Sequence, residues 1–238
     1  KEKVEQEKKA KSKKKDKKLF AKSKKISKEI TQLVDKLNEL KNKINEILST
    51  LPNIALEDVP IGKDDKSNKE ITKFGEIPSF NFKPKTHYEI GNKMKLMDFD
   101  TATKTSGARF VFLKGALARL ERAISDFMLD THTMEFGYQE ISPPLLVSEN
   151  TMFGTGQLPK FESDQFEIKI DGEKNRKFLI PTAEVILTNM VRESSFNKED
   201  LPIRLVASTA CFRKEAGSYG KDTKGMLRQH QFHKVELV

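Results

Sequence analysis

Two strand-like segments near the end of the sequence decide the fold: IRLVASTACFRKE (203–215) and MLRQHQFHKVELV (226–238). They flank the Gly- and Lys-rich stretch AGSYGKDTKG (216–225), which predicts an antiparallel hairpin with a long basic loop. Side chains alternate between the two faces of a strand, so one face would carry Arg213, Glu215, Arg228, His230, Phe232, Lys234 and Glu236. Charged side chains are costly to cover with core. This face is therefore a candidate floor of a binding site.

The side chains on this face suit a ligand that carries both phosphate and an aromatic ring. The planar guanidinium groups of Arg213 and Arg228 can form paired, charge-assisted hydrogen bonds with phosphate oxygens. Phe232 can stack on a base. The alternative is a solvated sheet face on which opposite charges pair across the strands. The residues alone leave both interpretations open.

A second polar pair, Thr182 and Glu184, follows the apolar stretch FLIP (178–181), where a strand passes into a helix. In one interpretation Thr182 caps the helix and Glu184 is a first-turn acid that favours the helix dipole. In the other, both side chains face a ligand and Glu184 pairs with an ammonium group. Both interpretations remain open at this point.

The rest of the body, which begins near Thr86, mixes helices and short strands. We expect strands in 139–147, 165–170 and 177–180, and a helix in 182–193. An amphipathic helix is expected from Leu113 to about Thr133, with its apolar face in the core. The order lacks a regular βαβ rhythm, which favours an α+β domain with a largely antiparallel sheet.

The N-terminal part differs in charge from the body. Residues 1–28 hold 14 Lys and four acids, a net charge of +10, whereas the whole chain has a formal charge of +9. Such an arm suits a polyanion, because neutralising phosphates releases counterions; a solvated charge run is the alternative. The lysines predicted to bind nucleic acid are Lys13, Lys14, Lys15, Lys17 and Lys18.

A heptad pattern of apolar residues runs from Ile26 to Leu51 and predicts a helical coiled-coil arm over 1–52. The seam needs a partner helix. Residues 1–14 are expected to form the end of an antiparallel partner, with Ser12 to Lys18 as the basic tip. Pro52 ends the helix, and the Pro-, Gly- and Asp-containing stretch 53–85 is expected to be a linker.

Several classes of protein are disfavoured by composition. Cys211 is the single cysteine, so a disulfide framework is excluded and a reducing, cytosolic setting is expected. No apolar run approaches the ~20 residues of a membrane span. His230 and His233 are three residues apart, on opposite faces of a strand, so we expect no metal site within the chain. The chain lacks an initiator Met and stops inside a strand-like segment, so both ends look cut.

Three motifs, in this order, carry a resemblance to class II aminoacyl-tRNA synthetases, most closely to the seryl-tRNA synthetase family of bacterial or organellar type. GYQEISPPLL (137–146) resembles motif 1, and PTAE (181–184) resembles the serine-binding element of that family. FRKE (212–215), the basic loop and RQHQFHKVE (228–236) resemble motif 2. The N-terminal helix is similar to the tRNA-binding arm of the family.

The resemblance implies a serine-tRNA ligase that activates serine with ATP and transfers it to tRNA(Ser), with tRNA(Sec) as a further acceptor. It implies that Arg213 and Arg228 are catalytic: Arg213 at the α-phosphate and the serine carboxylate, and Arg228 at the γ-phosphate. Phe232 would stack on adenine and Glu215 would bind its amino group. Lys221 would meet the ATP phosphates, and Lys221 and Lys224 the tRNA acceptor end.

By the same resemblance, serine would be bound by Thr182, Glu184, Arg213 and Glu236, and Pro144 would lie at the interface of a homodimer. Residues 86–238 would be a catalytic domain that holds motifs 1 and 2. Motif 3 and the Mg²⁺ ligands of the family are expected beyond the C-terminal end, so the chain alone is expected to be inactive. Lys214 stands where the family has a small residue, but on the face opposite Arg213.

Two rival functions remain. A class II synthetase paralogue that loads an amino acid onto a carrier protein would keep Arg213 and Phe232, but would not need a Lys-rich arm. A non-catalytic coiled-coil RNA-binding protein would need only the arm, which leaves the polar sheet face unexplained.

Overall fold

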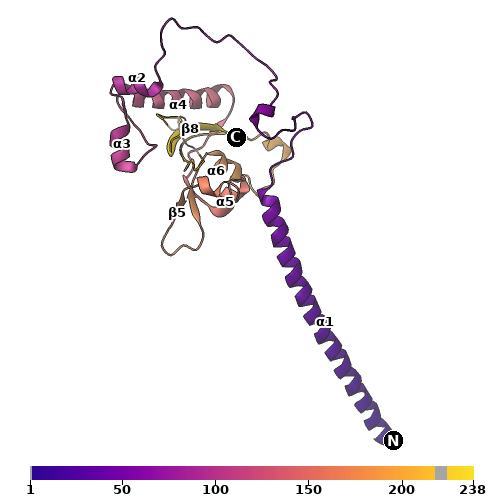
Figure 1. Ribbon diagram of the computed structural model, residues 1–238. Coiled ribbons are helices and arrows are strands. Elements are labelled where there is room, and N and C mark those ends of the chain that lie inside the picture. The colour runs from indigo at the N-terminus through magenta and orange to yellow at the C-terminus, as the bar shows by residue number, and fades with distance from the viewer. Residues whose placement is uncertain (1, 218–223) are drawn as a thin grey trace. The chain divides into compact units, whose positions relative to one another are not determined.

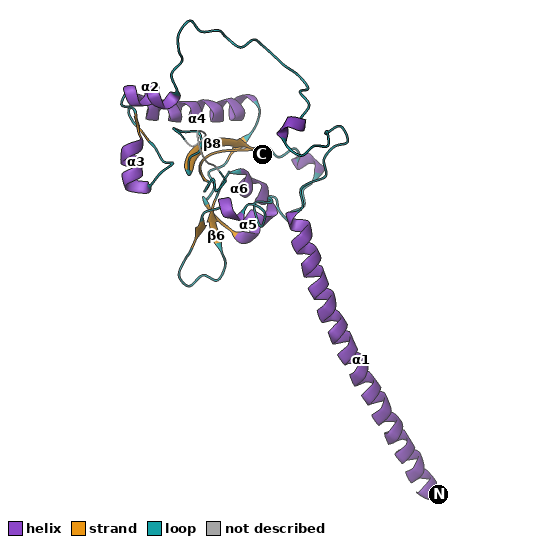
Figure 2. Ribbon diagram, in the orientation of Figure 1, coloured by secondary structure: helices purple, strands orange, loops and turns teal. Residues whose placement is uncertain are grey.

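The computed structural model describes the backbone of residues 2–217 and 224–238; within residues 1–18 it describes the side chains of Ser12 and Lys17 alone. The chain divides into two compact units, residues 1–57 and 58–238. Figure 1 labels the main elements of both units, and Figure 2 separates helix, strand and loop by colour. The mixed helix and sheet content confirms the predicted α+β class.

The first unit is dominated by one helix, α1 (Glu2–Thr50). The expectation of a turned tip at Ser12 to Lys18 is wrong, because the helix passes through this stretch without a break. The physical reason is local: the segment has no Gly or Pro, and lysine is a good helix former. The described part of this unit holds no partner helix. The residues of the predicted seam are all exposed, seven in α1 and Leu51 just after it: Ile26, Ile30, Leu33, Leu37, Leu40, Ile44, Ile47 and Leu51.

Between α1 and α2 the described chain has one regular element, the 3-10 helix η1 (Asp65–Ser67). The division into arm, linker and catalytic domain stays a prediction. Helix α2 (His87–Lys93) begins at a capping box, in which the Thr86 side chain accepts from the Glu89 amide and the Glu89 carboxylate accepts from the Thr86 amide. This cap fixes the start of the helix at His87.

The central sheet has the order β3-β7-β8. Strand β3 (Gln139–Glu140) is parallel to β7 (Leu205–Phe212), and β7 is antiparallel to β8 (Gln231–Leu237). The β7–β8 register places Cys211 opposite Phe232. The predicted strand 139–147 is divided, because Pro143 and Pro144 lack the amide hydrogen that a ladder needs.

A second, antiparallel sheet has the order β4-β6-β5 and packs against two short helices. Its core holds Phe178 and Ile180 with Met152, all at most 1% exposed. The helix predicted over 182–193 is shorter than expected. The strands and helices of this layer are β4 (Leu146–Ser148), α5 (Glu149–Gly154), η2 (Glu162–Asp164), β5 (Glu167–Ile168), β6 (Lys177–Leu179), α6 (Glu184–Asn189) and η3 (Lys198–Asp200).

The longest helix of the second unit, α4 (Ala116–Glu135), follows β1 (Met97–Asp98), α3 (Phe99–Ser106) and β2 (Phe112–Leu113). It contacts β7 and β8, and Figure 1 shows it alongside β8. Its start differs from the predicted one, because Leu113 belongs to β2 and Gly115, with φ of 53°, precedes the helix.

The prediction that the apolar face of α4 lies in the core is also wrong. None of the α4 residues is fully buried. Leu117 and Leu129 are partly buried, and the other large apolar side chains of the helix are exposed: Leu120, Ile124, Phe127, Met128 and Met134. Helical periodicity identified an apolar face correctly, but periodicity carries no information about what covers that face. None of the described helices is long and apolar enough to span a membrane.

Candidate active site

The turn that follows β7 shapes the site. The predicted strands 203–215 and 226–238 are longer than the observed β7 and β8, so Arg228 and His230 precede the strand that was expected to hold them. One further ladder bond joins the Arg213 amide to the His230 carbonyl at 3.0 Å. Beyond it, Glu215 has a φ of 51°, a left-handed conformation that is uncommon outside Gly and ends the strand.

Four of the predicted ligand-binding residues come together in one cavity of about 270 Å³: Arg213, Glu215, Arg228 and Phe232. The guanidinium carbon of Arg213 lies 5.3 Å from the centre of the Phe232 ring, a cation–π contact. The Arg228 guanidinium donates to the Glu215 carboxylate at 3.2 Å. Cation, carboxylate and aromatic ring thus line one hollow, and their roles toward a nucleotide stay predictions.

A second group of polar residues lies at the other end of β8. The Thr182 hydroxyl, 4% exposed, donates to the Glu236 carboxylate, and Lys234 forms an ion pair with the same carboxylate. Burial by itself raises the pKa of Glu236, but the hydrogen bonds from Lys234 and Thr182 outweigh it, and the pKa lies below its ordinary value. Glu236 is therefore held as a carboxylate at neutral pH.

The strand-to-helix junction shows what Thr182 contacts, and its role toward a ligand stays a prediction. The N-cap of α6 is Ala183, which has no side-chain cap, so Thr182 is not the capping residue. Its hydroxyl instead accepts from the Glu184 amide at 3.3 Å and donates to Glu236. Glu184 lies in the first turn of α6, where a carboxylate also favours the helix dipole, and its side chain is exposed.

Arg213 links the two polar groups. Its Nε donates to the carbonyl oxygen of Pro181 at 3.2 Å, next to Thr182, while its guanidinium faces Phe232. The charge of Arg213 also contributes to the lowered pKa of Glu236. One guanidinium is thus placed between the aromatic cavity and the Thr182–Glu236 pair.

Several residues that support this site escaped sequence reasoning. Asp164 accepts the amide hydrogens of Lys214 and Ala216, and the Arg109 guanidinium donates to the Glu215 carbonyl at 2.9 Å. These partners lie about 50 to 106 residues away along the chain. Local patterns carry no signal for such contacts. Lys234 was placed on the correct face, but its pairing with Glu236 was not anticipated.

The other predicted site residues lie elsewhere or outside the description. Lys221 falls within 218–223, outside the described residues, and Lys224 is exposed. Pro144 is exposed between β3 and β4. Lys17 is exposed on α1; Lys13, Lys14, Lys15 and Lys18 belong to the same helix, and their side chains lie outside the described part.

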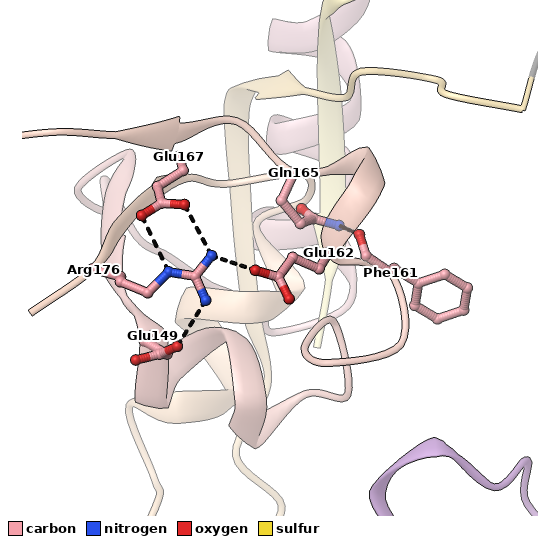
Figure 3. A network of polar contacts seen from close by, with 6 residues as sticks. All are labelled: Glu149, Phe161, Glu162, Gln165, Glu167 and Arg176. Carbon is pink, nitrogen blue, oxygen red and sulfur yellow. Dashed lines mark hydrogen bonds and ion pairs between the residues drawn. The ribbon is translucent and has the colours of Figure 1, made fainter. Parts of the chain in front are cut away.

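An ionic cluster is centred on Arg176, as Figure 3 shows. Arg176 binds the carboxylates of Glu149 at 3.0 Å, Glu167 at 2.9 Å and Glu162. The hydrogen bonds that Arg176 donates to Glu167 and then to Glu162 raise the pKa of Arg176, and the Arg176 guanidinium lowers the pKa of Glu167. Within the described residues, no group of three or more His, Cys, Asp or Glu side chains could hold a metal ion.

Comparison with known proteins agrees with this fold. Residues 165–238 match the family described as "tRNA synthetase class II core domain (G, H, P, S and T)". The seryl-tRNA synthetase from Pyrococcus horikoshii complexed with ATP superposes with a TM-score of 0.79 at 37% identity, covering 92% of this chain and 52% of that one. The chain has a class II aminoacyl-tRNA synthetase fold.

Within that class, the relatives are serine-tRNA ligases. The enzyme so named from Pelagibacter ubique is 62% identical over 235 residues, which are 99% of this chain and 56% of that protein. The one from Methylocella silvestris is 57% identical over 207 residues, covering 80% of this chain and 45% of that protein. The chain thus spans about half the length of these relatives, and the predicted resemblance to the seryl-tRNA synthetase family is confirmed.

Proposed function

We propose that the protein carrying this chain is a serine-tRNA ligase, which forms seryl-adenylate from serine and ATP and transfers the seryl group to tRNA(Ser). The observation that carries the proposal is Arg213, placed between the Phe232 cavity and the Thr182–Glu236 pair. The relatives named serine-tRNA ligase support the choice of serine.

In the activation step, a carboxylate oxygen of serine attacks the α-phosphorus of ATP. The new O–P bond forms as the bond to the β-phosphate oxygen breaks, and pyrophosphate leaves. Serine is already a carboxylate at neutral pH, so the step needs no protein base. Positioned cations and in-line orientation supply the catalysis, because charge develops on phosphate oxygens. Arg213 would bind the α-phosphate and the serine carboxylate, and Arg228 the γ-phosphate.

Nucleotide binding would replace contacts between side chains of the site with contacts to the nucleotide. Arg228 pairs with Glu215, and Arg213 covers Phe232. Adenine would stack on Phe232, its amino group would donate to Glu215, and Arg228 would turn to phosphate. Two solved relatives, one in complex with ATP and one in complex with AMP, support a nucleotide in this fold. Mg²⁺ would accompany the ATP phosphates.

Serine recognition would use the second polar group. The Thr182 hydroxyl and the Glu236 carboxylate would meet the serine hydroxyl and ammonium, with Glu184 as a further partner of the ammonium. A site built to hydrogen-bond a hydroxyl rejects alanine strongly, because alanine leaves buried polar groups unpaired. The geometry therefore favours serine over an apolar amino acid of similar size.

The remaining partners are tRNA and a second copy of the protein. Lysines 13, 14, 15, 17 and 18 on α1 would bind tRNA phosphates, and Lys221 and Lys224 the acceptor end. The open apolar face of α4, together with Pro144, would form a homodimer interface. A role in translation would place the protein in the cytoplasm.

Arg213→Ala in the full-length protein tests the activation step. Serine-dependent ATP–pyrophosphate exchange should fall by about 10²- to 10³-fold, because the variant lacks a positioned charge at the transition state. tRNA binding should stay unchanged. Arg204→Ala, which removes an exposed arginine at the far end of β7, is the control and should keep its activity.

Two outcomes would contradict the proposal. Exchange activity that persists in Arg213→Ala would remove the arginine from the reaction. Pyrophosphate exchange without tRNA charging by the unmutated protein would favour a paralogue that loads a carrier protein.

A further inference from the structure

The backbone of the turn after β7 is held by groups that lie outside the hairpin. Asp164 accepts two of its amide hydrogens: that of Lys214 at its carbonyl oxygen, and that of Ala216 at its carboxylate, both at 2.8 Å. The Arg109 guanidinium donates to the Glu215 carbonyl at 2.9 Å. The backbone is thus held at Glu215 and on both sides of it.

Such anchoring matters because the turn is strained. Glu215 has a φ of 51°, which a side chain with a Cβ seldom adopts. Strained conformations persist where the surroundings over-determine them, and they gather at functional sites. Without its anchors the turn would relax toward an ordinary extended path, and the side chains of Arg213 and Glu215 would move relative to Phe232.

Asp164 is itself held in a rigid frame. It ends η2, between Glu162 and Glu167, and both of these carboxylates bind Arg176 (Figure 3). The next residue, Gln165, is 2% exposed and donates to the Phe161 carbonyl at 3.0 Å. The Asp164 carboxylate is thus presented to the turn from a segment that is fixed on both sides.

We propose that Asp164 is a positioning residue for nucleotide binding. It would act through the turn, by fixing the direction of Arg213 and Glu215, and Arg176 would hold the segment that carries it. The inference rests on the proposed function, since it assigns a role within the ATP-binding half of the same site. It adds a residue from outside the hairpin to those that form the site.

The test uses the full-length protein with Asp164→Ala, Asp164→Asn and Asp171→Ala. Asn keeps a side-chain oxygen that accepts from the Ala216 amide, whereas Ala removes it. Asp171 is exposed between β5 and β6 and serves as the matched control. The measurements are the KM for ATP, the KM for serine and kcat in pyrophosphate exchange, with ATP affinity from equilibrium dialysis.

Asp164→Ala should raise the KM for ATP and weaken ATP binding by roughly tenfold to a hundredfold, since small misplacements of catalytic groups carry losses of this order. The KM for serine should rise several times less than the KM for ATP, because Thr182 and Glu236 lie outside the turn and Arg213 is the one proposed serine ligand that the turn positions. Asp164→Asn and Asp171→Ala should remain close to the unmutated protein. A merely structural role would not separate the two substrates or be rescued by Asn.

The inference is overturned if Asp164→Ala binds ATP normally, or if Asp164→Ala and Asp164→Asn are equally impaired. Should the Ala variant fail to fold, Asp164→Glu replaces it: the charge is kept, the carboxylate is displaced, and ATP binding should weaken severalfold. Lack of exchange by the unmutated protein would overturn the proposed function instead, and ATP affinity would still decide the role of Asp164.

Discussion

In the proposed serine site, single side chains would determine which amino acid binds, and Thr182 provides the most direct test. Its hydroxyl is buried with Glu236 as its acceptor. Thr182→Val keeps the shape of the side chain but removes the hydroxyl. The KM for serine should rise by roughly tenfold, in line with the ~1–3 kcal/mol that an unpaired buried polar partner costs. The KM for ATP should stay the same.

Thr182→Ser is the matched control, because it restores the hydroxyl and lacks one methyl group. Its KM for serine should return close to that of the unmutated protein. An equal rise in both variants would mean that Thr182 acts through packing, and it would remove the residue from serine recognition.

The sequence predicted which hairpin residues share a site, but it did not predict the residues from other elements that hold the hairpin turn. Arg213 and Phe232 were predicted to share a site because alternation along a strand is a local rule, and the structure places them 5.3 Å apart. Asp164 and Arg109 reach the same turn from other elements, and no spacing in the sequence indicates such contacts. Lys214 caused no conflict: its side chain is exposed, with its charge 5.8 Å from the centre of the Phe166 ring.

The C-terminal end of the hairpin loop is hydrogen-bonded to the first residue of α2. Gly225 has a φ of 68°, and the next amide, of Met226, donates to Nε2 of His87 at 2.8 Å. A Cβ at position 225 would lie 2.3 Å from that nitrogen. Gly225→Ala should therefore lower the free energy of unfolding by about 1–2 kcal/mol from the left-handed backbone alone, with a further decrease from the clash. Urea denaturation measures the change.

Gly217→Ala is the control at the other end of the same loop. Its backbone is outside the left-handed region, and no described heavy atom lies within 4 Å of the added Cβ. Its stability should stay within about 0.5 kcal/mol of the unmutated protein. Equal destabilisation by both substitutions would contradict the special role of the contact with His87.

Helix α1 carries the predicted tRNA contacts. Replacement of Lys13, Lys14, Lys15, Lys17 and Lys18 by Gln should weaken tRNA binding, because fewer counterions are released from the phosphates. The slope of log affinity against log salt should become shallower by roughly 0.7–0.9 for each phosphate that the protein no longer neutralises. Filter binding across a salt series measures both quantities.

The matched control makes the same change in charge outside α1, at five exposed lysines: Lys63, Lys66, Lys69, Lys73 and Lys83. This variant should keep most of the affinity and the slope. If the two variants are weakened equally, the binding reflects net charge and the assignment to α1 is wrong.

Element types were predicted better than element ends. The long helix over 19–51 and the hairpin exist, because a heptad seam and period-two alternation each extend over many residues. The ends were misjudged where one local feature decides them. Helix α1 continues through Ser12 to Lys18 because this stretch has no helix breaker. Strand β7 ends earlier than predicted because Glu215 adopts a left-handed conformation.

The proposed homodimer would use the apolar face of α4, whose large side chains are mostly exposed in the described chain. Phe127, 70% exposed, lies on this face. Phe127→Asp should dissociate the proposed homodimer, because it would place a charge in an apolar interface. Sedimentation velocity should show a shift from dimer to monomer for this variant in the full-length protein.

Arg122→Asp is the control, since helical spacing places Arg122 on another face of α4. It should sediment like the unmutated protein. A dimer that survives Phe127→Asp, or dissociates equally with Arg122→Asp, would contradict the proposed interface.

The core assignment for α4 failed because sequence reasoning treats one chain at a time. An apolar stripe at helical spacing predicts that a face will be covered, and the covering partner can be another molecule. The α+β class, by contrast, follows from the order of elements within the chain and was confirmed.

Serine activation is tested most directly by amino-acid-dependent ATP–pyrophosphate exchange on the full-length protein, measured with each of the standard amino acids. Arg213 between the Phe232 cavity and the Thr182–Glu236 pair predicts exchange with serine and background rates with all others, alanine included. Exchange with a different amino acid, or with none, would contradict the assignment of this chain to a serine-tRNA ligase.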